Sequence, residues 1–285
     1  MRFTPENVPL SELIEGIDEK SIALPEFQRD FIWKPPAIAD LLRTIARRWP
    51  AGTFLLLEVD EGPEFAYKGI EGAPKPDNPK TLILDGQQRT TAIYQALAGH
   101  APETYYVEMK EIAKDGEFDD EDLKYLKNDR FAKQFPTTKA QADARVIEVA
   151  ALGSDQEFTK WLRLIDDEGE QDDMVRIREE LLPGLRQYEM PTVRLKAAET
   201  PLAAIAKIFE TINSTGVRLA TFDLMVARLY PYDFRLRDQW DDARDTHGEF
   251  ADFGVDDGVE ILKVIALREH LRQRDLGPDH HHAGH

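Results

Sequence analysis

One short segment constrains the fold more than any other: an apolar run that ends in Asp-Gly and continues directly into residues typical of a helix. The segment 82–92 reads LILDGQQRTTA. Thr81 to Leu84 is typical of a buried strand, and Thr90 to Ala98, closed by Gly99, is typical of a helix. Such a junction presents free backbone N–H groups and the positive end of the helix dipole. The segment therefore predicts an α/β unit with an anion site at this turn.

The residue types in the turn suit an anion such as a phosphate group. Gly86 lets the backbone approach a ligand closely. Arg89 offers a planar fork that matches phosphate oxygens. Gln87 and Gln88 can donate and accept hydrogen bonds, so either could read a base or orient a water. Asp85 could hold a divalent cation or act as a base.

A structural alternative exists for the same residues: a polar turn in which Thr90 caps the helix. For a strand–Asp-Gly–helix junction taken alone, this alternative is favoured by about two to one. Two adjacent glutamines and an arginine within one turn are unusual, and they shift the interpretation toward a binding site.

A second segment, 24–35, reads LPEFQRDFIWKP and places Gln28 and Arg29 among aromatic residues. A polar pair in that setting can bind a base by stacking and a phosphate by charge. The alternative is a surface turn whose aromatic side chains pack into the core. On its own, the segment favours the structural alternative.

A third segment, 209–224, reads FETINSTGVRLATFDL. A helix over 201–212 is followed by a polar turn, and a new helix starts near Thr221. Gly216 is typical of a position with positive φ. Ligand contact and a plain helix–turn–helix connector are equally supported by the turn, whose polar residues are Asn213, Ser214 and Thr215.

The remaining pattern predicts a small sheet with a large helical portion. Further strands are expected over 53–59, 104–109 and 190–195, and further helices over 36–49, 222–230 and 256–273. The helix over 36–49 places Trp49 on its apolar stripe, and 111–188 is expected to be acidic and helical. The expected division is an α/β core over 1–110, an insertion over 111–188 and a returning strand with C-terminal helices over 189–285.

The three segments together, in this order, resemble domain-of-unknown-function family 262, the N-terminal domain of GmrSD-type modification-dependent restriction proteins. The similar runs are FQRDFIW, ILDGQQRTTAI and FETINSTGVRLATFDL, within a similarity from about 8 to 230. The resemblance implies a ParB/sulfiredoxin-like α/β fold and NTP binding and hydrolysis coupled to sensing of modified phage DNA. In several members a separate His-Asn-His nuclease domain follows, and this sequence shows no such pattern.

The motif positions give the expected site. Ala220 departs from the family, which commonly has Ser or Thr there, and Thr221 could replace it as a cap; Asp223 matches the closing acidic position. The expected catalytic residues are Asp85, Gln87, Gln88 and Arg89, with Asp85 also a candidate Mg²⁺ ligand. The expected nucleotide-binding residues are Gln28, Arg29, Gly86, Thr90, Thr91, Asn213, Ser214, Thr215 and Gly216.

Charge and composition narrow the partners. The formal net charge is −18, which argues against a broad nucleic-acid coat, although residues 20–50 lean basic. The chain has no cysteine, which excludes disulfides, zinc fingers and thiol nucleophiles. Neither a signal peptide nor a membrane span is visible, so a cytoplasmic location is expected. The terminal HHHAGH could be a native tail, a tag or a weak metal-binding sequence.

The leading hypothesis is an NTPase sensor domain of a restriction system. In it, Arg29 and Arg89 hold phosphates, Gln87 or Gln88 orients the attacking water, and Asp85 positions Mg²⁺ or that water. Its expected partners are an NTP, modified double-stranded DNA, a linked or separate nuclease domain and a further copy of the chain. The alternatives are a non-catalytic module that binds modified DNA or protein and, third, a ParB-like nuclease.

Overall fold

A computed structural model describes residues 3–26, 28–59, 66–200, 234–247 and 262–268, and single positions or pairs between 204 and 229. Two sheets organise these residues. The larger is six-stranded and mixed, with the order β1-β9-β3-β5-β2-β4. Its strands are β1 (Phe3–Pro9), β9 (Glu189–Lys196), β3 (Phe54–Glu58), β5 (Thr81–Asp85), β2 (Ile22–Pro25) and β4 (Tyr67–Lys68).

The pairing of the large sheet brings distant parts of the chain together. β1 pairs antiparallel with β9, so that Phe3 lies opposite Leu195, and β9 pairs parallel with β3. β5 lies between β3, its antiparallel partner, and β2, its parallel partner. The end of β5, where the Asp-Gly turn begins, therefore lies next to the start of β3.

Both faces of the central strands β3 and β5 are buried, which explains the continuous apolar run of β3. Phe54 and Leu56 belong to the larger hydrophobic core, whereas Leu55 and Leu57 point to a second cluster that includes Ile205. Alternate residues of a strand point to opposite faces, so a strand covered on both sides is apolar throughout. The helices on the first face are α1 (Leu10–Asp18), α2 (Pro35–Ala46) and α3 (Gln87–Leu97).

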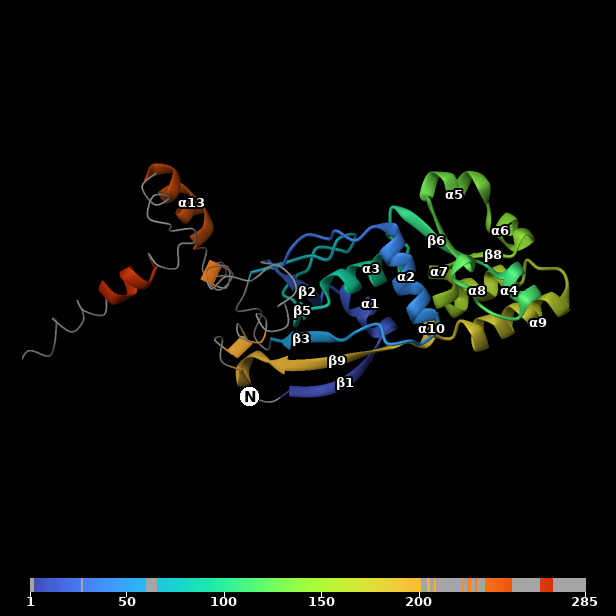
Figure 1. The fold of residues 1–285 in the computed structure, drawn as a ribbon, viewed down its shortest axis with the longest axis horizontal. Helices are drawn as coiled ribbons and strands as arrows, with labels where there is room; N and C mark the ends of the chain where they lie inside the picture. The colour runs from blue at the N-terminus through green and yellow to red at the C-terminus, as the bar shows by residue number, and fades with distance from the viewer. Residues whose placement is uncertain are drawn as a thin grey trace, which may run out of the picture.

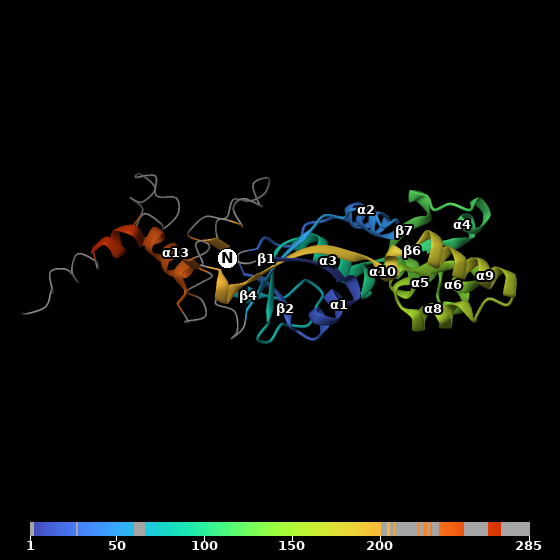
Figure 2. The same cartoon turned by 90° about the horizontal axis from the view of Figure 1, so that it is seen from below.

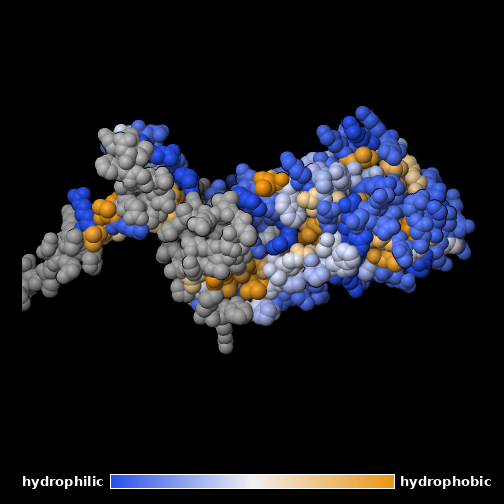
Figure 3. All heavy atoms as spheres, viewed as in Figure 1, coloured by the Kyte–Doolittle hydropathy of each residue, from blue (hydrophilic) through white to orange (hydrophobic). Residues whose placement is uncertain are grey.

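The smaller sheet has three strands in the order β7-β6-β8. These are β6 (Glu103–Glu108), β7 (Leu123–Lys127) and β8 (Val146–Glu148). The helices of this part are α4 (Met109–Asp115), α5 (Asn128–Gln134), α6 (Thr138–Ala144), α7 (Val149–Gly153), α8 (Asp155–Leu162) and α9 (Glu168–Arg176). They lie with the small sheet at one end of the large sheet (Figures 1 and 2), and their surface is predominantly hydrophilic (Figure 3).

Short elements complete the described chain. A π-helical stretch, η2 (Ile177–Leu181), follows α9, and α10 (Gly184–Gln187) precedes β9. Two 3-10 turns are η1 (Asp120–Asp122) and η3 (Ala197–Glu199), and α13 (Leu236–Thr246) lies near the C-terminus. Among the described residues, no helix combines the length and the apolar character that a membrane crossing requires.

The mixed α/β class and the returning strand are confirmed. Two details of the expected elements are wrong. α3 begins at Gln87 instead of Thr90, because Gly86 already turns the chain after β5. α2 ends at Ala46, before a turn with Arg48 at positive φ, so that Trp49 leaves the helical stripe and is 57% exposed.

Other expectations have more limited outcomes. The 111–188 segment is mostly helical, but it also contains β7 and β8, which the sequence pattern did not predict. The helices expected over 201–212, 222–230 and 256–273 lie largely outside the described residues, although their described positions are helical. The division into 1–110, 111–188 and 189–285 stays a prediction, as does the relation to ParB and sulfiredoxin.

Candidate functional site

Gly86 forms the turn from β5 into α3, and only glycine fits there. Its φ is +99°, in the left-handed region. A Cβ atom added to it would lie 2.3 Å from Cδ1 of Phe54, well inside contact distance. The backbone of the turn is thus pressed against the first residue of β3, and the first N–H groups of α3 follow immediately.

The adjacent glutamines hold the second motif against the first turn of α3. Oε1 of Gln88 accepts a hydrogen bond from the backbone N–H of Ile32 at 2.9 Å, and its Nε2 donates to the carbonyl of Asp30 at 3.0 Å. Nε2 of Gln87 donates to the carbonyl of Arg29. Both glutamine side chains are buried. Their amides therefore position the 29–32 segment, a role that the sequence alone did not predict.

Gln28 fastens the same segment from the other side. Its Nε2 donates to the carbonyls of Ile83 and Leu84, at 3.1 and 2.8 Å. Nζ of Lys68 donates to the Gln28 carbonyl and pairs with Asp30 at 3.3 Å. The segment before α2 is thus tied to β5 and β4 as well as to α3.

Arg89 lies on the first turn of α3 and faces the start of β3. Its Nη2 donates to the carbonyl of Thr53 at 2.7 Å and pairs with Oδ2 of Asp85 at 3.3 Å. The guanidinium lies over the ring of Phe54, 5.9 Å from the ring centre. A Cβ atom on Gly52 would approach Nη1 to 2.7 Å. Arg89 is 26% exposed, so the anchored guanidinium still reaches the surface.

These residues surround one hollow of about 170 Å³. Arg29 is exposed there, and within the described chain its guanidinium has no hydrogen-bond or ion-pair partner. The two arginines outweigh the one carboxylate in the lining, so the hollow favours an anion. Its size fits phosphate groups and not a whole nucleotide. The lining residues are Gln28, Arg29, Trp33, Asp85, Gly86, Gln87, Gln88 and Arg89.

Other expected site residues lie elsewhere. Thr90 and Thr91 are fully buried inside α3 and do not line the hollow. Within the described chain their hydroxyl oxygens have no hydrogen-bond partner. Asn213, Ser214, Thr215 and Gly216 of the third motif lie outside the described residues.

The structure adds residues that sequence reasoning missed. Trp33 lines the hollow, whereas the sequence indicated only an aromatic setting around Gln28 and Arg29. Gly52, Thr53 and Phe54 fix Arg89, yet the sequence signals only a helix stop and a buried strand at these positions. Their proximity follows from the pairing of β3 with β5, which no local pattern in the sequence reports.

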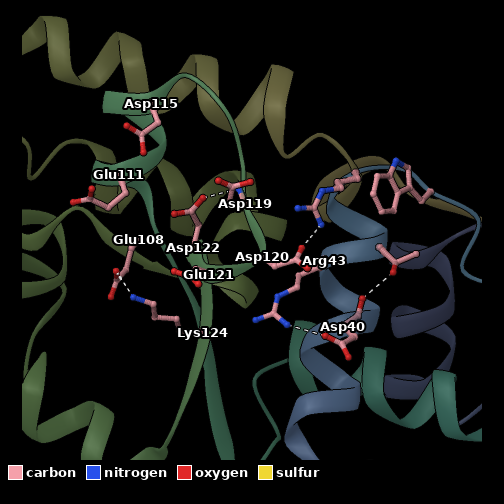
Figure 4. A pocket seen from close by; sticks show the side chains of 13 residues that line it. Asp40, Arg43, Glu108, Glu111, Asp115, Asp119, Asp120, Glu121, Asp122 and Lys124 are labelled. Atoms are coloured by element: carbon pink, nitrogen blue, oxygen red, sulfur yellow. Dashed lines mark hydrogen bonds and ion pairs between the residues drawn. The ribbon is translucent and has the colours of Figure 1, made fainter.

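A second hollow, of about 730 Å³, has the opposite charge character. It lies between α2 and the segment from β6 to β7 (Figure 4). On the α2 side, Arg43 pairs with Asp40 at 2.7 Å and Arg47 pairs with Asp120 at 2.6 Å. The opposite wall is predominantly acidic, with Glu108, Glu111, Asp115, Asp119, Glu121 and Asp122 beside Lys124. Such a wall repels phosphate, and in the described residues no group of three or more His, Cys, Asp or Glu is arranged to hold a metal ion.

Comparisons with known proteins support the resemblance drawn from the three motifs. The family model described as GmrSD restriction endonuclease, N-terminal domain, matches residues 10–230, a range that contains all three motifs. An uncharacterized protein of Methanocaldococcus jannaschii is 27% identical over 292 residues, which cover 93% of this chain and 48% of that relative. The chain thus spans about half the length of the relative.

Proposed function

The chain belongs to the family of GmrSD restriction endonuclease N-terminal domains, and from this premise we propose that it binds a nucleoside triphosphate at the Gly86 turn and hydrolyses it within a restriction, phage-defence system. The single observation that carries the proposal is the meeting of two motifs at one small hollow. Gln28-Arg29 and Asp85–Arg89 are far apart in the sequence, yet they line the same anion-sized space.

Phosphate groups bind between the two arginines. Arg89 is held in place by Thr53 and Asp85, so it meets a phosphate without much loss of side-chain freedom. The guanidinium of Arg29, which has no partner among the described residues, contacts the phosphates from the opposite segment. The first N–H groups of α3 add donors and a favourable dipole. Preorganised donors of this kind stabilise the charge that develops during phosphoryl transfer.

The two glutamines have different roles in this proposal. Gln88 uses both ends of its amide on the 30–32 backbone, which makes it a positioning residue. Gln87 uses Nε2 on the Arg29 carbonyl, and no hydrogen bond to its Oε1 is found among the described residues. Oε1 of Gln87 is therefore the group in this turn that orients the attacking water.

The residues present fit a Mg²⁺ ion only in a limited way. Asp85 supplies a carboxylate to the lining of the 170 Å³ hollow between Arg29 and Arg89, here named the phosphate hollow. Mg²⁺ is commonly bound through one or two carboxylates together with substrate phosphates. When bound, the ion would neutralise phosphate charge. Asp85 itself orients Arg89 in either case, through the ion pair at 3.3 Å.

Modified DNA and a nuclease domain complete the proposed system. Restriction in the family name, and the length of the relative beyond this chain, support a nuclease partner. The acidic wall beside α2 disfavours a broad DNA surface there, so DNA contact would be local or supplied by another domain. Modified double-stranded DNA is the expected signal, and NTP hydrolysis follows its recognition.

The test is nucleotide turnover by the wild type and by Arg29→Ala and Arg89→Ala. Both variants should lose phosphate binding and turnover by at least about tenfold, since each removes a charge-assisted contact. Arg130→Ala is the matched control, because Arg130 is an exposed arginine on α5 outside the hollow. Equal turnover in all four proteins, or no binding of any NTP by the wild type, would overturn the proposal.

The second candidate is a non-catalytic binding module. It is favoured by the structural use of the Gln87 and Gln88 amides, which leaves few free groups for chemistry. This module would bind modified DNA without turning over nucleotide. Binding of modified and plain duplex, measured across salt concentrations, separates the two: discrimination without nucleotide turnover supports the module, and a steep salt slope reveals phosphate contacts.

The nuclease alternative has less support. Within the lining of the hollow, Asp85 is the only carboxylate, and it is paired with Arg89. Metal-dependent cleavage generally uses several carboxylates around its ions. Asp85→Asn, assayed on plain and modified DNA, would revive this alternative if it abolished cleavage by the isolated chain.

A further inference from the structure

The phosphate hollow does not end at Arg89. A third hollow, of about 370 Å³, adjoins it and shares two of its lining residues, Trp33 and Arg89. The shared residues stand where the two hollows meet. Beyond them this third hollow, here named the α2 hollow, is lined by Ala37, Asp40, Leu41, Thr44, Pro50 and Ala51.

The chemistry of the α2 hollow differs from that of its neighbour. Leu41 and Ala51 are buried and form an apolar floor, with Ala37 and Pro50 at the side. Trp33 is half-buried and lines this space. Asp40 and Thr44 add polar atoms on one wall. An apolar space with an aromatic ring and a few polar groups suits a flat heterocycle better than a phosphate.

The two hollows together match the two ends of a nucleotide. The space between Arg29 and Arg89 is too small for a nucleoside triphosphate, so the base and sugar must lie outside it. The acidic hollow of Figure 4 shares no lining residue with the phosphate hollow, whereas the α2 hollow shares Trp33 and Arg89 with it. The polarity of the surroundings therefore gives the nucleotide a direction, from the Gly86 turn toward α2.

We propose that the α2 hollow is the nucleobase subsite, with the base stacked against Trp33 and the Arg89 guanidinium between base and phosphates. This inference rests on the proposed function. Base stacking on an aromatic side chain is tolerant of sequence, because every base has a π-face. The subsite would consequently accept several bases, while Asp40 favours those that present N–H donors toward it.

The experiment compares binding of inorganic tripolyphosphate with binding of ATP, GTP, CTP and UTP. Ala37→Trp fills the α2 hollow from an exposed helix position outside the phosphate lining, and Ala37→Ser is its matched control. Ala37→Trp should weaken nucleotide binding by about tenfold or more while tripolyphosphate binds as before. Trp33→Ala should also lower the preference for nucleotide over tripolyphosphate, and Trp33→Phe should restore most of it.

The outcomes distinguish a failure of the base subsite from a failure of the proposed function. If the wild type binds tripolyphosphate and nucleotides equally well, or if Ala37→Trp leaves nucleotide binding unchanged, the base subsite is wrong and the phosphate site stands. Equal weakening of both ligands by Ala37→Trp also overturns the subsite. If the wild type binds neither ligand, the proposed function itself fails.

Discussion

The side chain of Gln88 holds the backbone of Ile32, a residue 56 positions earlier in the chain. Its Oε1 accepts from the Ile32 N–H at 2.9 Å while its Nε2 donates to the neighbouring Asp30 carbonyl at 3.0 Å. One amide thus satisfies a donor and an acceptor of a segment that belongs to no sheet. The same contact fixes where Arg29 and Trp33 stand relative to the Gly86 turn.

Gln88→Glu should therefore weaken both the fold and the site. The carboxylate keeps the size of the side chain but loses the donor to Asp30 and places a charge in a buried position. We expect a loss of about 1–3 kcal/mol in the free energy of unfolding. Phosphate binding should fall as well, because the 29–32 segment is released. Denaturant unfolding and tripolyphosphate binding measure the two effects, and Gln134→Glu, at an exposed position on α5, is the control.

Gly86 offers a second test, with a control that isolates its cause. Gly86 and Gly116 both have positive φ, but a Cβ on Gly116 would meet nothing within 4 Å, whereas a Cβ on Gly86 would meet Phe54 at 2.3 Å. Gly86→Ala should be more destabilising than Gly116→Ala by about 1–3 kcal/mol, the usual cost of overpacking. Thermal or denaturant unfolding of the two variants gives the difference. Equal destabilisation would mean that φ alone requires the glycine.

Local sequence patterns predicted several strands of the large sheet but not their order. The apolar runs at 53–59 and 81–84 and the returning strand near 190–195 predicted strands, because buried strands are continuously apolar. The pattern held no information about their order, and the order is what brings Phe54 and Thr53 to Arg89. β7 was missed because its sequence, LKYLK, is short, lacks a regular alternation of polar and apolar residues and lies within an acidic region expected to be helical.

The candidate site was predicted by residue type better than by role. The Gln-Arg and Asp-Gly-Gln-Gln-Arg motifs were expected to form a site, and the structure brings them to one hollow. The sequence could not reveal that the side-chain amides of Gln28, Gln87 and Gln88 form hydrogen bonds with backbone groups, since those partners are fixed by tertiary contacts. Nor could it place Thr90 and Thr91 in the core, because the helix starts one turn earlier than the pattern indicates.

Asp122, in the acidic hollow, should make stability depend on pH. Burial raises the pKa of this carboxyl above its ordinary value of 3.8, although the hydrogen bond from the Asp119 backbone N–H, at 2.7 Å, works in the opposite direction. A carboxyl with a raised pKa in the folded state binds its proton more tightly there than in the unfolded chain. Its contribution to the free energy of unfolding is therefore greatest below pH 3.8 and is lost as the pH rises through the raised pKa.

The variant Asp122→Asn keeps an acceptor for Asp119 and removes the charge. It should be more stable than the wild type near neutral pH, and the difference should vanish below 3.8. Unfolding measured from pH 3 to pH 8 checks this dependence. Glu121→Gln, an exposed position on the same turn, controls for the loss of one negative charge from the hollow. A neutral-pH gain shared by both variants would point to overall charge repulsion instead of burial.

Gly52 should control the phosphate site without taking part in it. A methyl group on Gly52 would displace the Arg89 guanidinium, since Cβ would lie 2.7 Å from Nη1. Gly72→Ala is a close match, because both glycines are exposed and have positive φ, but the nearest atoms to a Cβ on Gly72 lie at an ordinary 3.5 Å. Gly52→Ala should weaken tripolyphosphate binding by about fivefold or more, the loss expected when a charge-assisted contact is distorted, while Gly72→Ala should not. If the two variants bind tripolyphosphate equally well, the position of Arg89 does not set phosphate affinity.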